Sequence, residues 1–209
     1  IAEQSGEKPF SGGQYLHPRQ GLRELERAMP ADVMVSTDIG NNCAIGNAYP
    51  SFEEGRKYLA PGLFGPCGYG FPAIIGAKIG CPDVPVVGFA GDGAFGMTAF
   101  DMETADRFNA PYIAVIGNNS AMNQIRYGQI AKYGEQRGNI GNLLGDVPFG
   151  KFAEMLGGYG EEVRDPSQIQ AALRRGREQI AKTGRSAVIN IWVGPREYAP
   201  GTKNQTMYK

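Results

Sequence analysis

The sequence is poor in the residues that build disulfide and zinc sites. Its 209 residues include one histidine and three cysteines, which are Cys43, Cys67 and Cys81. The number of cysteines is odd and no pair has a Cys-x-x-Cys spacing, so the pattern excludes a disulfide framework and a cysteine-based zinc motif. A chain of this kind is typical of a reducing compartment, and we expect a cytoplasmic location.

An excess of charge of one sign and long apolar runs are also missing. The 21 Lys and Arg residues balance 21 Asp and Glu residues, so the formal net charge is zero. A chain without net positive charge lacks the general electrostatic attraction that nucleic acids and anionic membranes require. The net charge does not exclude a local basic patch. No stretch approaches the roughly 20 apolar residues of a membrane helix. We therefore expect no nucleic acid and no membrane as a partner.

Glycine, in contrast, is abundant. The chain has 31 glycines, about twice the usual share, and they cluster between Gly40 and Gly96 without a fixed period. This clustering argues against collagen or low complexity and suggests loops whose backbone approaches a ligand closely. The chain is 42% hydrophobic and 20% charged, which is typical of a globular protein, and its length suits one domain.

The order of the predicted elements favours an α/β domain with a doubly wound parallel sheet and helices on both faces. The predicted strands are continuously apolar rather than alternating, which is typical of a parallel sheet that is covered on both sides. We assign residues 17–194 to this domain, residues 1–16 to a linker from a missing N-terminal part, and residues 195–209 to a C-terminal tail. Helices are predicted over 17–29, 72–80, 98–108, 149–156 and 167–181, a loop over 50–70, and strands over 32–37, 84–90, 111–116 and 187–193.

Three groups of glycine and polar residues follow directly after predicted strands, at 38–42, 91–93 and 118–119. Because ligands bind outside the carboxyl ends of such strands, we expect the three groups to form one site. The glycines at 91 and 93 let a backbone approach a diphosphate, and the following helix offers free N–H groups. Asp92 supplies a hard oxygen ligand for Mg²⁺, and Asn119 a second oxygen. Either motif alone is an ordinary turn, but the two together are far more specific.

The run Gly-Asp-Gly-Ala-Phe-Gly at 91–96, followed at this distance by Asn-Asn at 118–119, resembles the thiamine diphosphate motif of a family of enzymes. This family includes acetohydroxyacid synthase and oxalyl-CoA decarboxylase. The resemblance extends from about His17 to Val193. It implies the C-terminal, diphosphate-binding domain of such an enzyme, with the thiamine diphosphate-binding fold.

The resemblance also implies a set of residues for the cofactor and its metal. Cys67 occupies the position of a bulky apolar residue that supports the bent cofactor, and its other interpretation is a buried small hydrophobe. The implied Mg²⁺ ligands are Asp92, Asn119 and the carbonyl oxygen of Ala121. The implied cofactor-binding residues are Gly40, Asn41, Asn42, Gly65, Cys67, Gly91, Asp92, Gly93, Ala94, Asn119 and Met122.

No catalytic residue is assigned, because the glutamate that activates the cofactor lies in an N-terminal domain in this family. Asp38, Glu53 and Glu103 are expected to be surface, capping or phosphate-loop residues. The chain begins without an initiator methionine, and we expect it to be part of a longer protein. Its expected partners are the N-terminal pyrimidine-binding and middle domains of its own chain and further copies in a homo-oligomer, either a dimer or a tetramer.

The resemblance points to three subgroups of the family, which act on different substrates. The stretch from 17–20 to 38–41 resembles sulfoacetaldehyde acetyltransferase, whereas 91–107 and 189–191 resemble oxalyl-CoA decarboxylase and 2-hydroxyacyl-CoA lyase. On this resemblance, the favoured activity is cleavage of a 2-hydroxyacyl-CoA to formyl-CoA and an aldehyde or ketone. Sulfoacetaldehyde acetyltransferase and acetolactate synthase chemistry are the alternatives.

One residue departs from the pattern of the acyl-CoA enzymes. Asn123 stands where those enzymes often carry tyrosine, and this change makes the identity of the substrate less certain. Met122 and Ile125 are expected to form an apolar wall beside the substrate. The tail could fold over an acyl-CoA site and bring Tyr198 to the substrate, with plain disorder as the equal alternative.

Two other classes of protein stay open. A non-catalytic regulatory or binding subunit could retain this fold, although the intact Asp92, Asn119 and phosphate loops argue against decay. A nucleotide-binding Rossmann domain is the second alternative, since Gly91 to Gly96 matches the Gly-x-Gly-x-x-Gly spacing. Asp92 lies inside that match and would repel a dinucleotide's phosphates unless a metal intervenes.

Overall fold

The computed structural model of the chain describes residues 24–25, 27–40 and 57–194. The predicted linker (1–16) and the predicted tail (195–209) lie outside the described residues. Of the helix predicted over 17–29, residues 24–25 and 27–28 are described as helical. Among the described helices, none combines the length and the apolar character that crossing a membrane requires.

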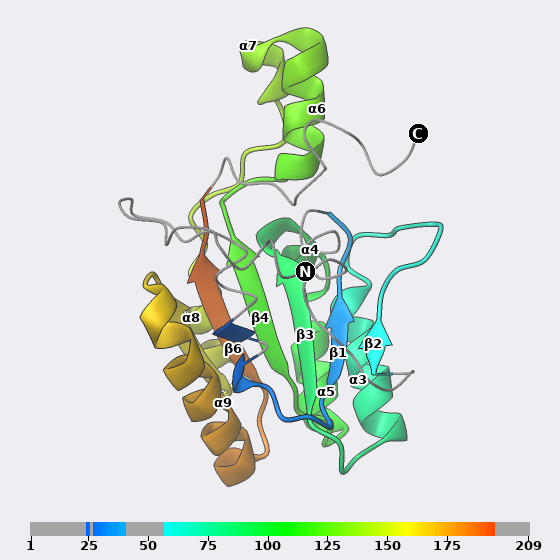
Figure 1. Cartoon of the computed structure of the whole chain (residues 1–209), viewed down its shortest axis with the longest axis vertical. Helices are drawn as coiled ribbons and strands as arrows, with labels where there is room; N and C mark the ends of the chain where they lie inside the picture. The colour runs from blue at the N-terminus through cyan, green and yellow to red at the C-terminus, as the bar shows by residue number, and fades with distance from the viewer. Residues whose placement is uncertain (1–23, 26, 41–56, 195–209) are drawn as a thin grey trace, which may run out of the picture.

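Six strands form one sheet at the centre of the described chain (Figure 1). Their order across the sheet is β2-β1-β3-β4-β6-β5, and every neighbouring pair is parallel. This arrangement confirms the predicted parallel sheet. The strands are β1 (Met34–Thr37), β2 (Tyr58–Leu59), β3 (Val86–Gly91), β4 (Ile113–Asn118), β5 (Tyr159–Val163) and β6 (Ala187–Trp192).

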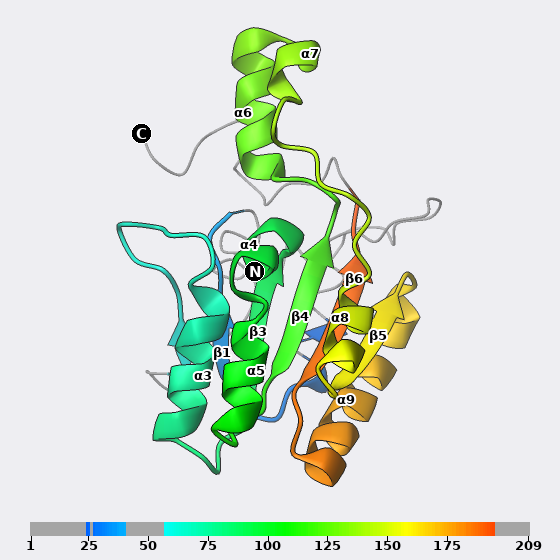
Figure 2. The same cartoon turned by 180° about the vertical axis from the view of Figure 1, so that it is seen from behind.

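Helices cover both faces of the sheet, which confirms the doubly wound α/β fold (Figures 1 and 2). One face carries α9 (Ile169–Thr183), which follows the short 3₁₀ helix η2 (Pro166–Gln168). The other face carries α3 (Gly70–Gly80), α4 (Asp92–Thr98), α5 (Asp101–Arg107) and α8 (Phe149–Met155).

The sheet separates two apolar cores, because successive residues of a strand point to opposite faces. In β3, Val87 and Phe89 pack into the core beneath α9. Val86 and Ala90 pack into the core beneath α3, α5 and α8. Burial on both sides explains why this strand is apolar without alternation.

An aromatic cluster fixes the helix that leaves β3. The Phe71 ring lies on the backbone of Gly88, where an added Cβ would stand 2.8 Å from ring atoms. Phe71 meets Phe95 edge to face with centroids 4.9 Å apart, and Phe95 meets Phe149 in the same way at 5.1 Å. Each such pair contributes about 0.5–1.5 kcal/mol beyond its buried area. Since Phe95 belongs to α4, the cluster also fixes Asp92, the first residue of that helix.

Two helices that the sequence pattern does not predict extend beyond the carboxyl ends of the strands. They are α6 (Asn123–Tyr133) and α7 (Glu135–Gly138), and both views show them standing away from the layered body (Figures 1 and 2). Asn123 is the buried residue of α6. A helix that does not pack an apolar stripe against a core lacks the periodic signal by which helices are predicted.

The structure also differs from the sequence predictions at the edges of the sheet and after β3. The edge strand β5 was not predicted, because its sequence Tyr-Gly-Glu-Glu-Val does not have the apolar character of the inner strands. The two-residue strand β2 falls within the loop predicted over 50–70. The single helix predicted over 98–108 is replaced by α4, which begins within the predicted Gly-Asp-Gly turn, and α5.

Candidate functional site

A small cavity of about 70 Å³ lies at the carboxyl ends of β1, β3 and β4. Along the chain, β1 leads outward to β2 on one side, whereas β3 leads outward to β4 on the other. The cavity therefore spans a topological switch point, where open α/β sheets bind ligands. All the predicted site residues that the structure describes line this cavity, with the exception of Gly65. The predicted residues Asn41, Asn42 and Tyr198 lie outside the described residues.

Asp92 is a buried acid that directly follows the carboxyl end of β3. Its carboxylate oxygen Oδ2 accepts the backbone N–H of Ala121 at 3.0 Å. Burial raises the pKa of Asp92 to about 6, against the opposing effect of backbone N–H donors from Gly93 and Ala121. The ionised form is therefore costly in this cavity unless a cation approaches it.

Asn119 brings a second side-chain oxygen to the same place. Its Oδ1 accepts the N–H of Ala121 at 3.2 Å, so the oxygens of Asp92 and Asn119 converge on one backbone group. Between Asn119 and Ala121, Ser120 has a φ of 56°, in the left-handed region that non-glycine residues seldom adopt. This turn determines where the backbone of Ala121 lies relative to the two side-chain oxygens.

The segment 139–148 holds the Ser120 turn in place. The N–H of Leu144 donates to the carbonyl oxygen of Ser120 at 2.8 Å, and the Ser120 hydroxyl donates to Asp146. Asn118 Nδ2 donates to the carbonyl oxygen of Val147 at 2.9 Å. Sequence reasoning did not identify Asp146, because its partner is 26 positions away.

Gly93 allows close packing against the turn that leads from Asn119 to Met122. A Cβ built at Gly93 would lie 2.1 Å from the sulfur of Met122, so the Met122 side chain rests directly on the Gly93 backbone. This contact is made with a side chain of the protein, so the approach of the Gly93 backbone to a diphosphate stays a prediction. Met122 is partly exposed and forms part of the cavity wall.

Cys67 lines the cavity but is exposed, so its interpretation as a buried small hydrophobe is wrong. Partial burial of the sulfur raises the pKa of the Cys67 thiol, and the nearby charge of Asp38 raises it further. The group therefore stays a neutral thiol, which argues against a nucleophilic role, and its support of the cofactor stays a prediction. Gly65 has a φ of 58° in the same turn.

The start of α6 completes the cavity. Asn123 is buried, and its Oδ1 accepts a hydrogen bond from Arg126 at 3.2 Å. Ile125 is 48% exposed, so it adds apolar surface at the opening. Gln124 also lines the cavity, and its Oε1 would stand 3.4 Å from a Cβ at Gly40. Sequence reasoning missed Gln124 because this helix was not predicted.

Asp38 lies at the end of β1 and is fully buried, not on the surface. Its carboxylate accepts backbone N–H groups from Ile39, Gly68 and Gly70. Glu103, in contrast, is exposed and pairs with Arg107 at 3.0 Å, as expected for a surface residue. Glu53 lies outside the described residues.

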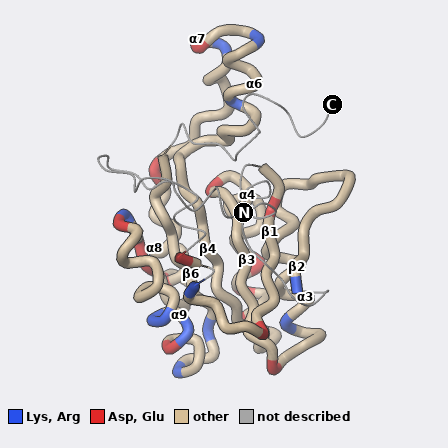
Figure 3. Tube along the Cα trace, in the orientation of Figure 1, with Lys and Arg blue, Asp and Glu red and all other residues tan. Residues whose placement is uncertain are grey.

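The donor set suits a magnesium-bound diphosphate. No Lys or Arg from the described part of the chain lines the cavity, and in Figure 3 basic residues are concentrated on α9 instead. The described residues also contain no cluster of three or more His, Cys, Asp or Glu side chains able to hold a metal. Mg²⁺ prefers one or two carboxylates together with phosphate oxygens and water, and one carboxylate with an amide oxygen fits that preference.

The family of the chain follows from comparison with known proteins. Residues 38–191 match the family described as "Thiamine pyrophosphate enzyme, C-terminal TPP binding domain". The matched region begins just after β1 and includes β3, β4 and all the described residues of the cavity. The chain therefore belongs to the thiamine diphosphate-dependent enzymes, as their C-terminal cofactor-binding domain.

Three individual proteins of this family are similar to the chain. The chain is 49% identical over 169 residues to a probable sulfoacetaldehyde acetyltransferase of Rhizobium meliloti (strain 1021), covering 80% of this chain and 28% of that protein. It is 42% identical over 191 residues to a sulfoacetaldehyde acetyltransferase of Alcaligenes xylosoxydans xylosoxydans, covering 91% and 31%. It is 30% identical over 191 residues to 2-hydroxyacyl-CoA lyase 2 of Mus musculus, covering 90% and 30%. The chain thus spans less than a third of the length of these relatives.

Proposed function

We propose that this domain anchors thiamine diphosphate and Mg²⁺ in an enzyme that transfers the acetyl group derived from sulfoacetaldehyde. The observation that carries the proposal is the higher identity to sulfoacetaldehyde acetyltransferases, at 49% and 42%, than to 2-hydroxyacyl-CoA lyase 2, at 30%. Asn123 supports the same choice, because it stands where acyl-CoA enzymes often carry tyrosine. The preference for acyl-CoA cleavage that the sequence resemblance suggests is revised accordingly.

The proposed anchor uses one charged and two neutral oxygens. Asp92 and Asn119 contribute side-chain oxygens to Mg²⁺, and Ala121 contributes its carbonyl oxygen. The backbone N–H groups of Gly93 and Ala94 bind the diphosphate. Because no described Lys or Arg lines the cavity, the metal provides the positive charge that the diphosphate requires.

The remaining cavity residues shape the space beside the reacting carbon. When bound, thiamine diphosphate would supply a carbanion for addition to an aldehyde carbonyl and an electron sink for negative charge on the carbon that it attacks. Met122 and Ile125 provide an apolar wall that limits access of water, and Cys67 supports the cofactor from the opposite loop. The acid that activates the cofactor comes from the N-terminal part of the protein, in a homo-oligomer in which two subunits complete each site.

A second candidate function is cleavage of a 2-hydroxyacyl-CoA to formyl-CoA and an aldehyde or ketone. It is favoured by the match to the mouse lyase, which extends over 90% of this chain. The two candidates share the cofactor anchor and differ in the substrate that the rest of the protein admits.

Product analysis of the full-length protein separates the two candidates. Sulfoacetaldehyde with inorganic phosphate should give acetyl phosphate and sulfite in equal amounts, since the carbon–sulfur bond breaks and the acetyl group passes to phosphate. A 2-hydroxyacyl-CoA and pyruvate, offered separately, should give little product. Formyl-CoA from the acyl-CoA, without acetyl phosphate from sulfoacetaldehyde, would contradict the proposal. Asp92→Asn should abolish turnover of every substrate, which identifies this site as the source of the activity.

A further inference from the structure

Two loops that line the cavity are joined by a single buried side chain. One loop follows β1 and carries Gly40, and the other is the turn 65–70 before α3, which carries Cys67. Asp38 links them: its Oδ1 accepts the N–H of Ile39 at 2.8 Å and that of Gly68 at 3.0 Å. Its Oδ2 accepts the N–H of Gly70 at 2.6 Å. These three donors come from both loops.

The turn before α3 has little freedom to move away from Asp38. Gly68 has a φ of 86°, and a Cβ there would stand 3.1 Å from the Thr98 side chain of α4. A Cβ at Gly70 would stand 3.1 Å from the backbone nitrogen of Asp38. The Ser36 hydroxyl donates to the carbonyl oxygen of Gly70. The turn is therefore packed between β1 and α4, and both the N–H and the carbonyl oxygen of Gly70 are hydrogen-bonded to residues at the end of β1.

Burying a carboxylate at this position costs free energy, and hydrogen bonds to the surrounding backbone can offset that cost. Asp38 is fully buried, and within the described ranges no Lys or Arg forms an ion pair with it. Burial raises its pKa, while the N–H groups of Gly70, Gly68 and Ile39 oppose that change. Backbone N–H groups are thus the partners that compensate the acid, and they in turn are held at fixed positions by it.

We propose that Asp38 is a positioning residue for thiamine diphosphate: it locks the end of β1 to the turn 65–70, so that Gly40 and Cys67 form a preformed wall of the cofactor cavity. Asp38 does not contact the cofactor. It lowers the cost of binding, because the two loops are already ordered relative to each other before the cofactor arrives.

Asp38→Asn tests this role with almost no change in shape. The amide keeps one acceptor oxygen but turns its NH₂ group toward N–H groups that need an acceptor. We expect the affinity of the full-length protein for thiamine diphosphate, at saturating Mg²⁺, to fall about tenfold or more, which is the usual effect of losing a side chain that orients ligand-binding groups. In cofactor-free protein, hydrogen exchange at the amides of Gly68 and Gly70 should become faster.

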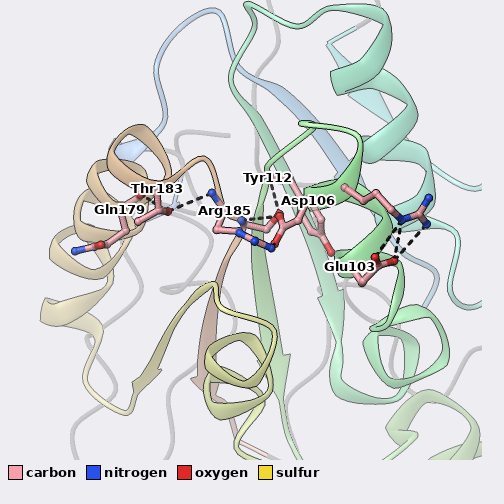
Figure 4. A network of polar contacts seen from close by, with 8 residues as sticks. Glu103, Asp106, Tyr112, Gln179, Thr183 and Arg185 are labelled. Carbon is pink, nitrogen blue, oxygen red and sulfur yellow. Dashed lines mark hydrogen bonds and ion pairs between the residues drawn. The ribbon is translucent and has the colours of Figure 1, made fainter.

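Asp106 provides a matched control at the opposite end of the sheet. It is also buried, and its Oδ1 accepts the N–H of Ser186 at 2.9 Å and the Ser186 hydroxyl at 2.7 Å. Arg185 lies 3.6 Å from its Oδ2. Figure 4 shows this network around Asp106 and Arg185, where the chain enters β6. Asp106→Asn should lower the thermal midpoint and speed exchange at Ser186, with cofactor affinity unchanged.

The two variants together decide the proposal. Wild-type cofactor affinity in Asp38→Asn, or an equal loss of affinity in both variants, would show that Asp38 is only structural. If Asp38→Asn yields no folded protein, Ser36→Ala weakens the same turn through the Gly70 carbonyl and must show the same selective loss of affinity. Calorimetry and exchange require no substrate, so failure of the proposed acetyl transfer leaves this proposal standing.

Discussion

Replacement of Asp92 by asparagine should change stability and cofactor binding in opposite directions. Burial raises the pKa of Asp92 from 3.8 to about 6, so the metal-free fold disfavours the ionised acid. At about 1.4 kcal/mol per pKa unit, ionised Asp92 costs that fold about 3 kcal/mol. Asparagine avoids this cost but loses part of the hydrogen bonding to Gly93 and Ala121, worth about 1 kcal/mol. We therefore expect Asp92→Asn to stabilise the metal-free domain by about 1–2 kcal/mol.

The advantage of the asparagine variant should depend on pH in one direction. Because the folded-state pKa of Asp92 lies above the unfolded value, both states are protonated and the penalty is absent below about pH 4. The penalty grows between about pH 4 and 6 and is complete above that range. The variant should therefore exceed wild type in stability at pH 8, and the difference should disappear as the pH falls toward 4.

Thermal unfolding of the full-length protein in EDTA measures this effect. The relevant transition is the one that thiamine diphosphate and Mg²⁺ shift upward, since ligands stabilise the domain that binds them. A gain of 1 kcal/mol raises the midpoint of a domain of this size by roughly 2–4 °C. Calorimetry should show that Asp92→Asn no longer binds the cofactor with Mg²⁺. Asn119→Ala is the control, because it removes a proposed ligand that carries no charge and should weaken binding without any stabilisation. A lower midpoint for Asp92→Asn in EDTA at pH 8 would refute the electrostatic reasoning.

Three further substitutions test the packing around the site. Gly93→Ala should weaken cofactor binding about tenfold with little change in the thermal midpoint, because the new Cβ displaces the flexible end of Met122; calorimetry that finds wild-type affinity would contradict the close approach. Ser120→Gly should leave the protein more stable than Ser120→Ala, since glycine adopts the φ of 56° without strain; the reverse order of thermal midpoints would count against that turn. Gly88→Ala should lower stability by about 1–3 kcal/mol, because its Cβ stands 2.8 Å from the buried Phe71 ring, while the affinity for thiamine diphosphate stays unchanged in the same calorimetric assay.

The inner part of the fold could be predicted from the sequence because its strands are buried on both faces. Continuous apolar runs identify β1, β3, β4 and β6, and the glycine and polar residues that follow three of them coincide with the cavity. The edge strand β5 could not be predicted in this way. Its Glu162 is satisfied by Gly150, Asn190 and Trp192, and partners so far away in the sequence leave no local pattern.

The role of Asp38 could not be predicted from the sequence for a related reason. An aspartate just after a strand is a frequent turn or capping residue, and nothing adjacent in the sequence indicates that it is buried. Its decisive partners, Gly68 and Gly70, lie 30 and 32 positions away. Gln124 and Asp146 were missed because their positions depend on α6 and on the segment 139–148, which lack a periodic apolar signal. Glycine and polar motifs that follow strands and line a cavity can thus be predicted, whereas the groups that orient them depend on tertiary contacts.

The two buried acids of the site act in different ways, and their difference links folding to cofactor loading. Asp38 is compensated by backbone N–H groups of the chain itself, so it can order the cavity before any ligand is present. Asp92 lines the cavity itself, and burial raises its pKa to about 6 although backbone N–H groups of Gly93 and Ala121 oppose that change. Mg²⁺ bound together with the diphosphate would supply the positive charge beside Asp92, so the metal should add stability by removing the penalty on Asp92 as well as by forming new bonds. A domain built in this way is most stable when loaded, and partial loss of Mg²⁺ should loosen the Ser120 turn before it disturbs the sheet.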